Sequence, residues 1–459
     1  MDFTTFLIIA LFVSFIALLL LGVQVAYALG GLAVIFTVIA IGLDKYAGTF
    51  IGLDFNVLSL IVNRIYQLLN NWLLVALPMF IFMGHMLDRS GVAQKLMHAL
   101  QNLFGRVRGG LALSVTLIGV LLAASTGIIG ASVVLLGILS LPAMLNQGYR
   151  KELAVGTVCG AGTLGILFPP SIMLIIMADQ IQLSVGALFM GAVIPGLILA
   201  TLYGTYILIY ALLKPEAAPL PANRSELSWA VLWELALAII PTIMLILLVL
   251  GSIFLGIATP TEASGLGAFG ALLLAAFNRN LGSDVLPSAL AETMRTMGFL
   301  FAIFIGATCF SLVLRLLGGD DLISGLLLGA DITPYSLIVL ILFIIFLLGF
   351  FLDWIEITLI ILPLIAPVVA ALNLESITTN LENAQLVWFA ILCAVTLQTS
   401  FLTPPVGFAL FYVKGVCPKG IELVNIYRGA VPFILLQLLT LILVLLFPSL
   451  VTWLPELTY

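Results

Sequence analysis

Residues 160–171 read GAGTLGILFPPS and interrupt a long apolar stretch, residues 152–182, with two consecutive prolines. Proline has no backbone N–H, and Pro170 also disfavours helical angles in the residue before it. A helix that crosses this segment must therefore unwind. Residues 398–407 read QTSFLTPPVG inside a second such stretch, residues 385–413, so the same break is predicted twice.

The composition points to a membrane protein. The 459-residue chain is 63% hydrophobic and only 8% charged, with a mean hydropathy of +1.30. Soluble domains carry about 25% charged residues, so this chain has too little charge to cover a water-facing surface. Because helices satisfy their own backbone groups in lipid, we predict an all-α polytopic protein whose surroundings are the lipid bilayer. The 16 Lys and Arg residues form no patch, which excludes nucleic acid as a partner.

A membrane helix needs about 20 mainly apolar residues. Ten stretches meet this requirement: 5–24, 27–43, 71–88, 152–182, 185–213, 231–252, 259–278, 296–314, 385–413 and 429–453. Two further apolar segments, 110–147 and 335–372, are too long for one span and are interrupted near their middles by Ser125-Thr126-Gly127 and by Asp353-Trp354. Each of the two is either a pair of full spans or a re-entrant helical hairpin.

The basic residues predict the orientation. If residue 1 lies outside and each span crosses once, every Lys and Arg except Lys45, Arg64 and Arg315 falls inside. Cytoplasmic loops are enriched in Lys and Arg, so this distribution places both termini outside.

The two halves of the chain resemble each other. Three elements of the first half recur in the same order in the second: Gly22–Gly30 as Gly256–Ser264, Phe80–Gly84 as Ala302–Gly306, and Pro169-Pro170 as Pro404-Pro405. Each half holds five spans and one interrupted segment, and five is odd, so the second copy must be inverted. We therefore predict two inverted repeats, residues 1–225 and 226–459, each with five transmembrane helices plus one hairpin, which is the plan of secondary transporters.

Short amphipathic stretches at residues 96–108 and 321–332 precede the two interrupted segments. They are too polar to span, and we interpret them either as interfacial arms that connect a moving part to a fixed part or as ordinary connecting helices.

The broken helices are the best candidates for a functional site, and no spaced set of catalytic residues is found. Unwinding frees carbonyl oxygens at mid-membrane depth, where backbone of this kind is tolerated only around a polar site. Carbonyl and hydroxyl oxygens are ligands that hold a desolvated alkali cation. Purely structural roles for these residues stay open. Gly156 can allow tight helix packing, and the Ser125 and Thr126 hydroxyls can donate hydrogen bonds to carbonyls of their own helix.

Three carboxylates lie in apolar surroundings. Asp353 and Glu356 each cost at least about 2.5–3.5 kcal/mol at the bilayer centre, so they should face a wet cavity, a partner or an ion. Asp353 is either a direct ligand or a cap, and Glu356 is expected to turn toward a solvent-filled vestibule. Glu262, in the TPTE segment at 259–262, is expected to stabilise a helix start.

At these residues the sequence resembles the large membrane subunit (M subunit, DctM-like) of the tripartite ATP-independent periplasmic (TRAP) transporters. The resemblance covers nearly the whole chain and rests on four elements: GTLGILFPPS at 162–171, GIATPTEA at 256–263, the Phe-x-Asp element at Asp353, and LTPPVG at 402–407. It implies the transport subunit of an elevator-type secondary transporter that couples uptake of an organic acid to the sodium gradient.

The resemblance also implies site residues. Sodium site 1 would comprise Ser125, Thr126, Gly127, Gly162, Leu164, Phe168 and Pro169. Sodium site 2 would comprise Gly349, Leu352, Asp353, Thr399, Phe401 and Thr403. The substrate would lie near Pro170, Ser171, Pro405 and Glu356. Many relatives have a Ser/Thr-rich tip after the aspartate, whereas this chain has Trp354-Ile355-Glu356, which leaves the second site and the substrate class open.

Two domains follow from the same likeness. A scaffold would comprise helices in residues 1–88 and 231–314. A transport domain would comprise hairpins 110–147 and 335–372, broken helices 152–182 and 385–413, and helices 185–213 and 429–453, with arms 96–108 and 321–332 between the two domains.

The expected partners are a small Q-type membrane subunit of four helices, a periplasmic P-type substrate-binding protein, an organic acid and Na⁺ as the coupling ion, with no cofactor. The expected location is the bacterial inner membrane with both termini periplasmic. Two alternatives remain: a stand-alone sodium/carboxylate symporter or sodium/proton antiporter of similar fold, and an intramembrane enzyme.

Overall fold

The protein is all-helical in the part that the structure describes. The computed structural model describes residues 3–458 except 50, 127, 128, 222–228, 330, 331, 373, 375, 376, 378 and 380. Within it, 11 helices are long and apolar enough to cross a membrane. The prediction of an all-α polytopic membrane protein is confirmed.

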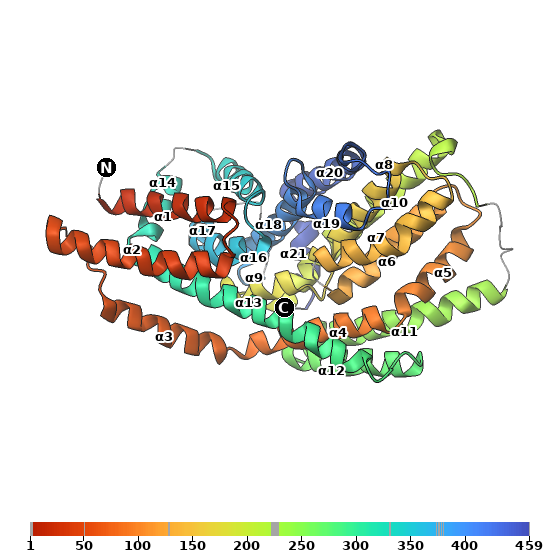
Figure 1. Ribbon diagram of the computed structural model, residues 1–459, viewed down its shortest axis with the longest axis horizontal. Coiled ribbons are helices and arrows are strands. Elements are labelled where there is room, and N and C mark those ends of the chain that lie inside the picture. Colours follow the sequence, from red (N-terminus) through yellow and green to blue (C-terminus); the bar gives the residue numbers. More distant parts are fainter. Residues whose placement is uncertain are drawn as a thin grey trace.

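A first group of long helices forms one side of the molecule (Figure 1). Its members are α1 (Phe3–Leu20), α2 (Val25–Ala47), α3 (Phe55–Leu69), η1 (Trp72–Val75), α4 (Ala76–Arg89), α11 (Trp229–Phe254), α12 (Pro260–Phe277) and α13 (Val285–Leu316). The main pairs within it are α4 with α12 and α2 with α13. Small residues permit close approach at both: a Cβ atom on Gly306 would lie 2.7 Å from the Ala26 carbonyl oxygen, and one on Gly267 would lie 2.6 Å from Met83 Sδ.

A second group packs against the first and contains the interrupted helices. The first hairpin consists of α6 (Gly110–Thr126) and α7 (Ile129–Asn146). The second hairpin consists of α15 (Pro334–Leu348), α16 (Trp354–Glu356), the π-helical turn η4 (Ile357–Ile361) and α17 (Leu362–Ala371). The remaining members are α8 (Lys151–Thr163), η2 (Leu164–Ile166), α9 (Ile172–Gln180), α10 (Val185–Leu213), η3 (Pro215–Ala217), α18 (Ala384–Leu402), α19 (Phe408–Val416), α20 (Leu423–Leu446) and α21 (Ser449–Glu456).

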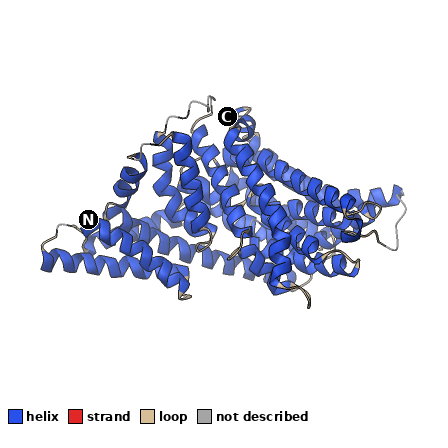
Figure 2. Cartoon of the chain, turned by 90° about the horizontal axis from the view of Figure 1, so that it is seen from above, coloured by secondary structure: helices blue, strands red, loops and turns tan. Residues whose placement is uncertain are grey.

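Two short helices join the groups. Helix α5 (Val92–Phe104) contacts α4 and α11 of the first group and α6 of the first hairpin. Helix α14 (Gly319–Leu328) contacts α13 and α1 of the first group and α17 of the second hairpin. Both helices begin earlier than the arms expected at 96–108 and 321–332, because left-handed Gly91 and Gly318 start them. Seen from above, the N-terminal helices lie at one end of an elongated molecule (Figure 2).

The start of α12 shows how the TPTE segment acts. The Glu262 N–H donates to Thr259 Oγ1 over 3.3 Å, and the Thr259 N–H donates to Glu262 Oε2 over 2.8 Å. This reciprocal capping box satisfies two otherwise orphaned backbone donors. The structural role expected for Glu262 is confirmed.

Helix α3 was not among the expected elements. It is 15 residues long, so it fell below the length of a membrane span. It packs against α13.

Contact between α8 and α20 gives a first prediction about stability. A Cβ atom on Gly156 would overlap the Gly429 carbonyl oxygen, and one on Gly429 would overlap the Glu152 carbonyl oxygen. We expect Gly156→Ala to destabilise the fold by about 1–3 kcal/mol, because backbone cannot move aside as a side chain can. Thermal unfolding in detergent measures this. Gly251→Ala in α11 is the matched control: nothing lies within 4 Å of its Cβ position, so an unchanged or slightly raised unfolding temperature is expected. Equal effects of the two substitutions would contradict the packing argument.

Candidate functional site

The first broken helix runs through the interior. Helix α8 ends at Thr163, a 3₁₀ turn covers Leu164–Ile166, and α9 begins at Ile172. The intervening residues, among them Phe168, are buried and non-helical, and the Pro169-Pro170 bond is cis. The helix therefore unwinds at the two prolines.

The second broken helix has the same plan. Helix α18 ends at Leu402, α19 begins at Phe408, and the Pro404-Pro405 bond between them is also cis. Gly407 caps α19 with a φ of 44°, a left-handed angle that favours glycine.

Both breaks contain backbone carbonyl oxygens that accept no backbone hydrogen bond in the described residues. In the described part of the chain, no backbone N–H donates to the carbonyls of Phe168, Pro169 or Pro170, nor to those of Pro404 or Val406. Such carbonyls are strong acceptors that rarely stay unpaired in a protein interior. They are free to coordinate a cation or to bind a polar ligand.

The first hairpin packs tightly on the first broken helix. A Cβ atom on Gly162 would overlap Val133 of α7, and one on Gly119 of α6 would lie 2.7 Å from the Ala161 Cβ. Gly162 is therefore placed where a hairpin backbone approaches it. Ser125 and Thr126 end α6, but their side chains, like the whole of Gly127, lie outside what the structure describes.

The second hairpin approaches the second broken helix at Gly349. A Cβ atom there would lie 2.6 Å from Ser400 Oγ, and Ser400 Oγ in turn donates to the Phe346 carbonyl over 2.9 Å. Leu352 is buried in the tip that follows. Asp353 accepts a hydrogen bond from the Trp354 N–H over 2.8 Å and so caps α16, the capping alternative of its two expected roles.

Glu356 differs from its expected position. Its side chain is not turned to a solvent-filled vestibule: the residue is only 1% exposed, so that expectation was wrong. The Trp354-Ile355-Glu356 tip begins a helix whose next turn is the π-helical η4, and this turn packs against α9 and α13. Among the described residues, no donor reaches Glu356 Oε2.

The other predicted residues serve packing or bond locally. The Phe168 ring lies over Gly196 of α10, and the Phe401 ring packs edge-on against Phe408 with centroids 5.7 Å apart. Thr399 Oγ1 donates to the Val395 carbonyl over 2.8 Å, and Thr403 Oγ1 to the Thr399 carbonyl over 2.7 Å. Each donation leaves lone pairs on the hydroxyl for another ligand.

Leu164, Ser171 and Pro405 also lie within or beside the two breaks. Leu164 is buried at the start of η2. Ser171 is the N-cap residue of α9, and its buried Oγ has no partner in the described residues. The Pro405 carbonyl accepts a hydrogen bond from the Tyr427 hydroxyl over 3.5 Å. Pro405 is exposed, whereas Leu164 and Ser171 are buried.

A polar contact that joins the two broken helices was missed. Gln398 Nε2 of α18 and Gln437 Nε2 of α20 donate to Thr163 Oγ1 of α8 over 3.4 and 3.3 Å. All three side chains are buried. The signal in the sequence was a glutamine within each of two apolar spans, since a buried amide needs a partner.

The two breaks are held in one interior region. The first hairpin contacts α8 through α6 and α7 and contacts α19 through α7, while the second contacts α18 through α15 and α17 and contacts α9 through η4. Each hairpin thus touches the first half of one broken helix and the second half of the other. Within the described residues, no group of three His, Cys, Asp or Glu side chains could hold a metal ion. The neutral oxygens found here instead suit a hard, weakly held cation such as Na⁺.

Comparison with known proteins identifies the family. Residues 12–450 match the family described as "Tripartite ATP-independent periplasmic transporter, DctM component". The chain is 30% identical over 397 residues to the C4-dicarboxylate TRAP transporter large permease protein DctM of Pseudomonas aeruginosa, covering 86% of this chain and 88% of that protein. It is 28% identical to the corresponding DctM of Vibrio cholerae, covering 97% of each chain.

Solved structures support the same class of fold. The YdaH transporter of Alcanivorax borkumensis superposes with a TM-score of 0.52 at 14% identity, over 83% of this chain and 88% of that chain. That identity shows a shared fold and nothing finer. From the family match and the DctM relatives, we conclude that the chain belongs to the DctM component family of TRAP transporters, as a multi-pass large permease subunit and not an enzyme.

Proposed function

We propose that this protein is the transport subunit of a sodium-coupled, binding-protein-dependent transporter that imports a carboxylate or sulfonate by an elevator mechanism. The observation that carries the proposal is the pair of matched broken helices, each held by a hairpin and each with free backbone carbonyls. Such sites at repeat interfaces bind substrate and coupling ions in secondary transporters.

The helix contacts support an inverted repeat. If the first half maps onto the second, α2 corresponds to α12 and α4 corresponds to α13. The contact between α4 and α12 then predicts an equivalent contact between α13 and α2. Both contacts are present. The contact of α7 with α19 likewise maps onto the contact of α17 and η4 with α9. Helices α5 and α14 take equivalent places as the arms between a scaffold (α1–α4 and α11–α13) and a transport domain.

Sodium site 1 would use the oxygens of the first break, near Gly162 and Phe168, together with the tip of the first hairpin. Sodium site 2 would use the second hairpin tip and the free lone pairs of Thr399 and Thr403. Glu356 would supply the negative charge that offsets a bound cation, since its Oε2 is buried and without a donor in the described residues. The substrate would lie between the two sites, near Ser171.

The relatives support the substrate class and the partners. Their names specify C4-dicarboxylate, isethionate and sialic acid, all of them organic acids. The isethionate protein, named DctMQ, is 27% identical, and this chain spans 65% of its length, which supports a separate Q-type membrane partner. We expect a P-type binding protein as the third component. We further propose the bacterial inner membrane as the location, with both termini periplasmic.

The charge balance favours uptake. A monoanion such as isethionate carried with two Na⁺ moves one net positive charge inward, which is worth about 2.3 kcal/mol per 100 mV. An elevator that moves both cations and substrate within one rigid unit requires no ATP in this chain.

The proposal predicts that uptake needs both Na⁺ and the binding protein. Proteoliposomes that hold this chain with its small partner are loaded with succinate or isethionate as test substrates, and radiolabel uptake is followed with each component omitted in turn. We expect uptake to fall by at least about tenfold without Na⁺, because the anion loses the driving force of the cations. Uptake that persists without the binding protein would indicate a stand-alone symporter, and uptake that ignores Na⁺ would overturn the coupling.

A further inference from the structure

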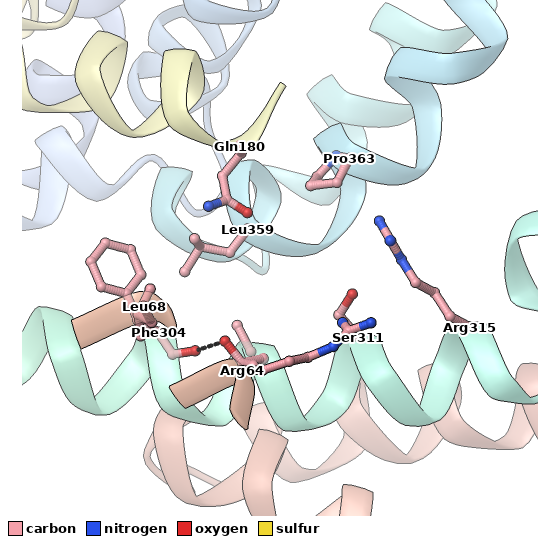
Figure 3. A pocket seen from close by; sticks show the side chains of 10 residues that line it. Arg64, Leu68, Gln180, Phe304, Ser311, Arg315, Leu359 and Pro363 are labelled. Carbon is pink, nitrogen blue, oxygen red and sulfur yellow. Dashed lines mark hydrogen bonds between the residues drawn. The ribbon is translucent and has the colours of Figure 1, made fainter. Parts of the chain in front are cut away.

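A polar cavity lies between the two groups of helices, at residues other than those of the two breaks. Its volume is about 150 Å³, and its polar lining comes from Arg64, Arg315, Gln180, Thr308 and Ser311. The polar side chains labelled in Figure 3 come from α3, α9 and α13, and Leu359 of η4 and Pro363 of α17 lie across from them. Thr308 also belongs to α13. The cavity is therefore bounded by both the helices of the proposed scaffold and those of the proposed transport domain.

Two guanidinium groups line this cavity. Arg315 has one weak ionic contact, Nε to Asp320 Oδ2 at 3.5 Å, which leaves its two terminal nitrogens available. Arg64 is half-buried, and no acceptor contacts its guanidinium in the described residues. Partial burial and the nearby charge of Arg315 lower the pKa of the Arg64 guanidinium, which stays protonated at neutral pH. Two like charges that share a small cavity are stabilised by a bound anion.

The location of these arginines is unusual for a membrane protein. Basic residues are scarce on the outer side, where only Lys45, Arg64 and Arg315 are expected. Two of these three line one cavity. A planar guanidinium binds carboxylate or sulfonate through parallel hydrogen bonds, and two such groups can hold both ends of a short dianion.

The rest of the lining is apolar and suits a small organic acid. The apolar part of the wall consists of Leu68, Phe304, Ala307, Leu359 and Pro363. Gln180 ends α9, whose first residue follows Ser171 of the proposed substrate region. Nine helical residues at about 1.5 Å each separate the two by roughly 13 Å. The cavity thus lies one length of α9 away from the place where the substrate is expected, toward the outer side of the membrane.

We propose that the cavity between Arg64 and Arg315 is an outer anion site, where a small carboxylate or sulfonate substrate binds the membrane subunit before it reaches the broken helices. The identity of the anion rests on the proposed function, whereas the presence of an anion site rests on the cavity alone. Arg64 and Arg315 are both expected on the outer side, so the site belongs to that side of the membrane.

The test compares three substitutions in the detergent-purified complex with the small membrane subunit. Succinate and isethionate serve as probes, with chloride at equal ionic strength as the reference salt, and thermal unfolding reports binding. We expect succinate to stabilise the wild type and to bind Arg64→Gln at least tenfold more weakly. Arg64→Lys keeps the charge but loses the paired N–H donors of the planar guanidinium, so an intermediate affinity is expected. Lys45→Gln removes a charge from the same side without touching the cavity and should bind succinate as the wild type does.

Transport gives an independent readout. In proteoliposomes, Arg64→Gln should raise the succinate concentration for half-maximal uptake about tenfold, and Lys45→Gln should leave it unchanged. Equal stabilisation of the wild type and Arg64→Gln by succinate would overturn the site. Stabilisation by phosphatidylglycerol alone would also overturn it, because the cavity would then hold a lipid headgroup. If wild-type uptake proves independent of Na⁺ while succinate still needs Arg64 to bind, the anion site stands and the sodium coupling fails.

Discussion

Uptake by the Glu356→Gln protein is expected to fall at least about 100-fold at physiological sodium, while the protein still folds. The carboxylate is 1% exposed, and in the described residues its Oε2 has no donor, so a positively charged ligand is the expected partner. Glutamine keeps the shape but removes the charge that offsets a cation in a low-dielectric site. The half-saturating Na⁺ concentration should rise by a similar factor, because the proposed cation site loses the negative charge of this buried carboxylate.

Titration of uptake with Na⁺ measures this effect. Glu382→Gln is the matched control, since Glu382 is an exposed carboxylate outside the helices, and its loss should leave the Na⁺ dependence unchanged. Size-exclusion profile and unfolding temperature show whether the variants fold. A Glu356→Gln protein with the wild-type Na⁺ dependence would show that this carboxylate does not act on the cation.

Gly349→Ala should also reduce uptake strongly, by about 10- to 100-fold. The new Cβ would lie 2.6 Å from Ser400 Oγ and 2.9 Å from Ser400 Cβ, so the hairpin tip must move away from α18. A displacement of this size would alter the distances between the oxygens of the proposed sodium site 2, and small misplacements of ligands have large effects. The substitution removes no polar group, so the loss would come from geometry alone.

A second substitution in the same chain separates geometry from other causes. Ser400→Gly removes both atoms that the new Cβ would meet, so Gly349→Ala with Ser400→Gly should recover much of the uptake that Gly349→Ala loses. Ser400→Gly alone costs the hydrogen bond to the Phe346 carbonyl and about 1 kcal/mol of helix stability. No recovery in the double variant would mean that Gly349 matters for a reason other than its contact with Ser400.

Local rules account for much of what the sequence predicted. The two proline pairs forbid a continuous helix wherever they occur, so both breaks could be placed to within a few residues. Thr259 and Glu262 lie three residues apart and cap their own helix, which also needs no tertiary information.

The missed features depend on contacts between distant segments. The burial of Glu356 depends on the packing of η4 against α9 and α13. The residues next to Glu356 in the sequence do not show this packing. Gln398 and Gln437 reach Thr163 from 235 and 274 residues away. The cavity beside Arg64 could not be predicted because α3, at 15 residues, is too short to be recognised as a membrane span and its contact with α13 joins distant segments.

The contact of Thr163 with Gln398 and Gln437 also bears on how the protein is made. A ribosome releases α8 into the bilayer well before the two glutamines exist, and until they arrive the Thr163 hydroxyl oxygen has no amide donor from them. The first half must therefore remain in the membrane as an incompletely packed intermediate. Its half-helices α8 and α9, of 13 and 9 residues, are each shorter than a bilayer span. Biogenesis of the core is thus a late event that only synthesis of the C-terminal helices can complete.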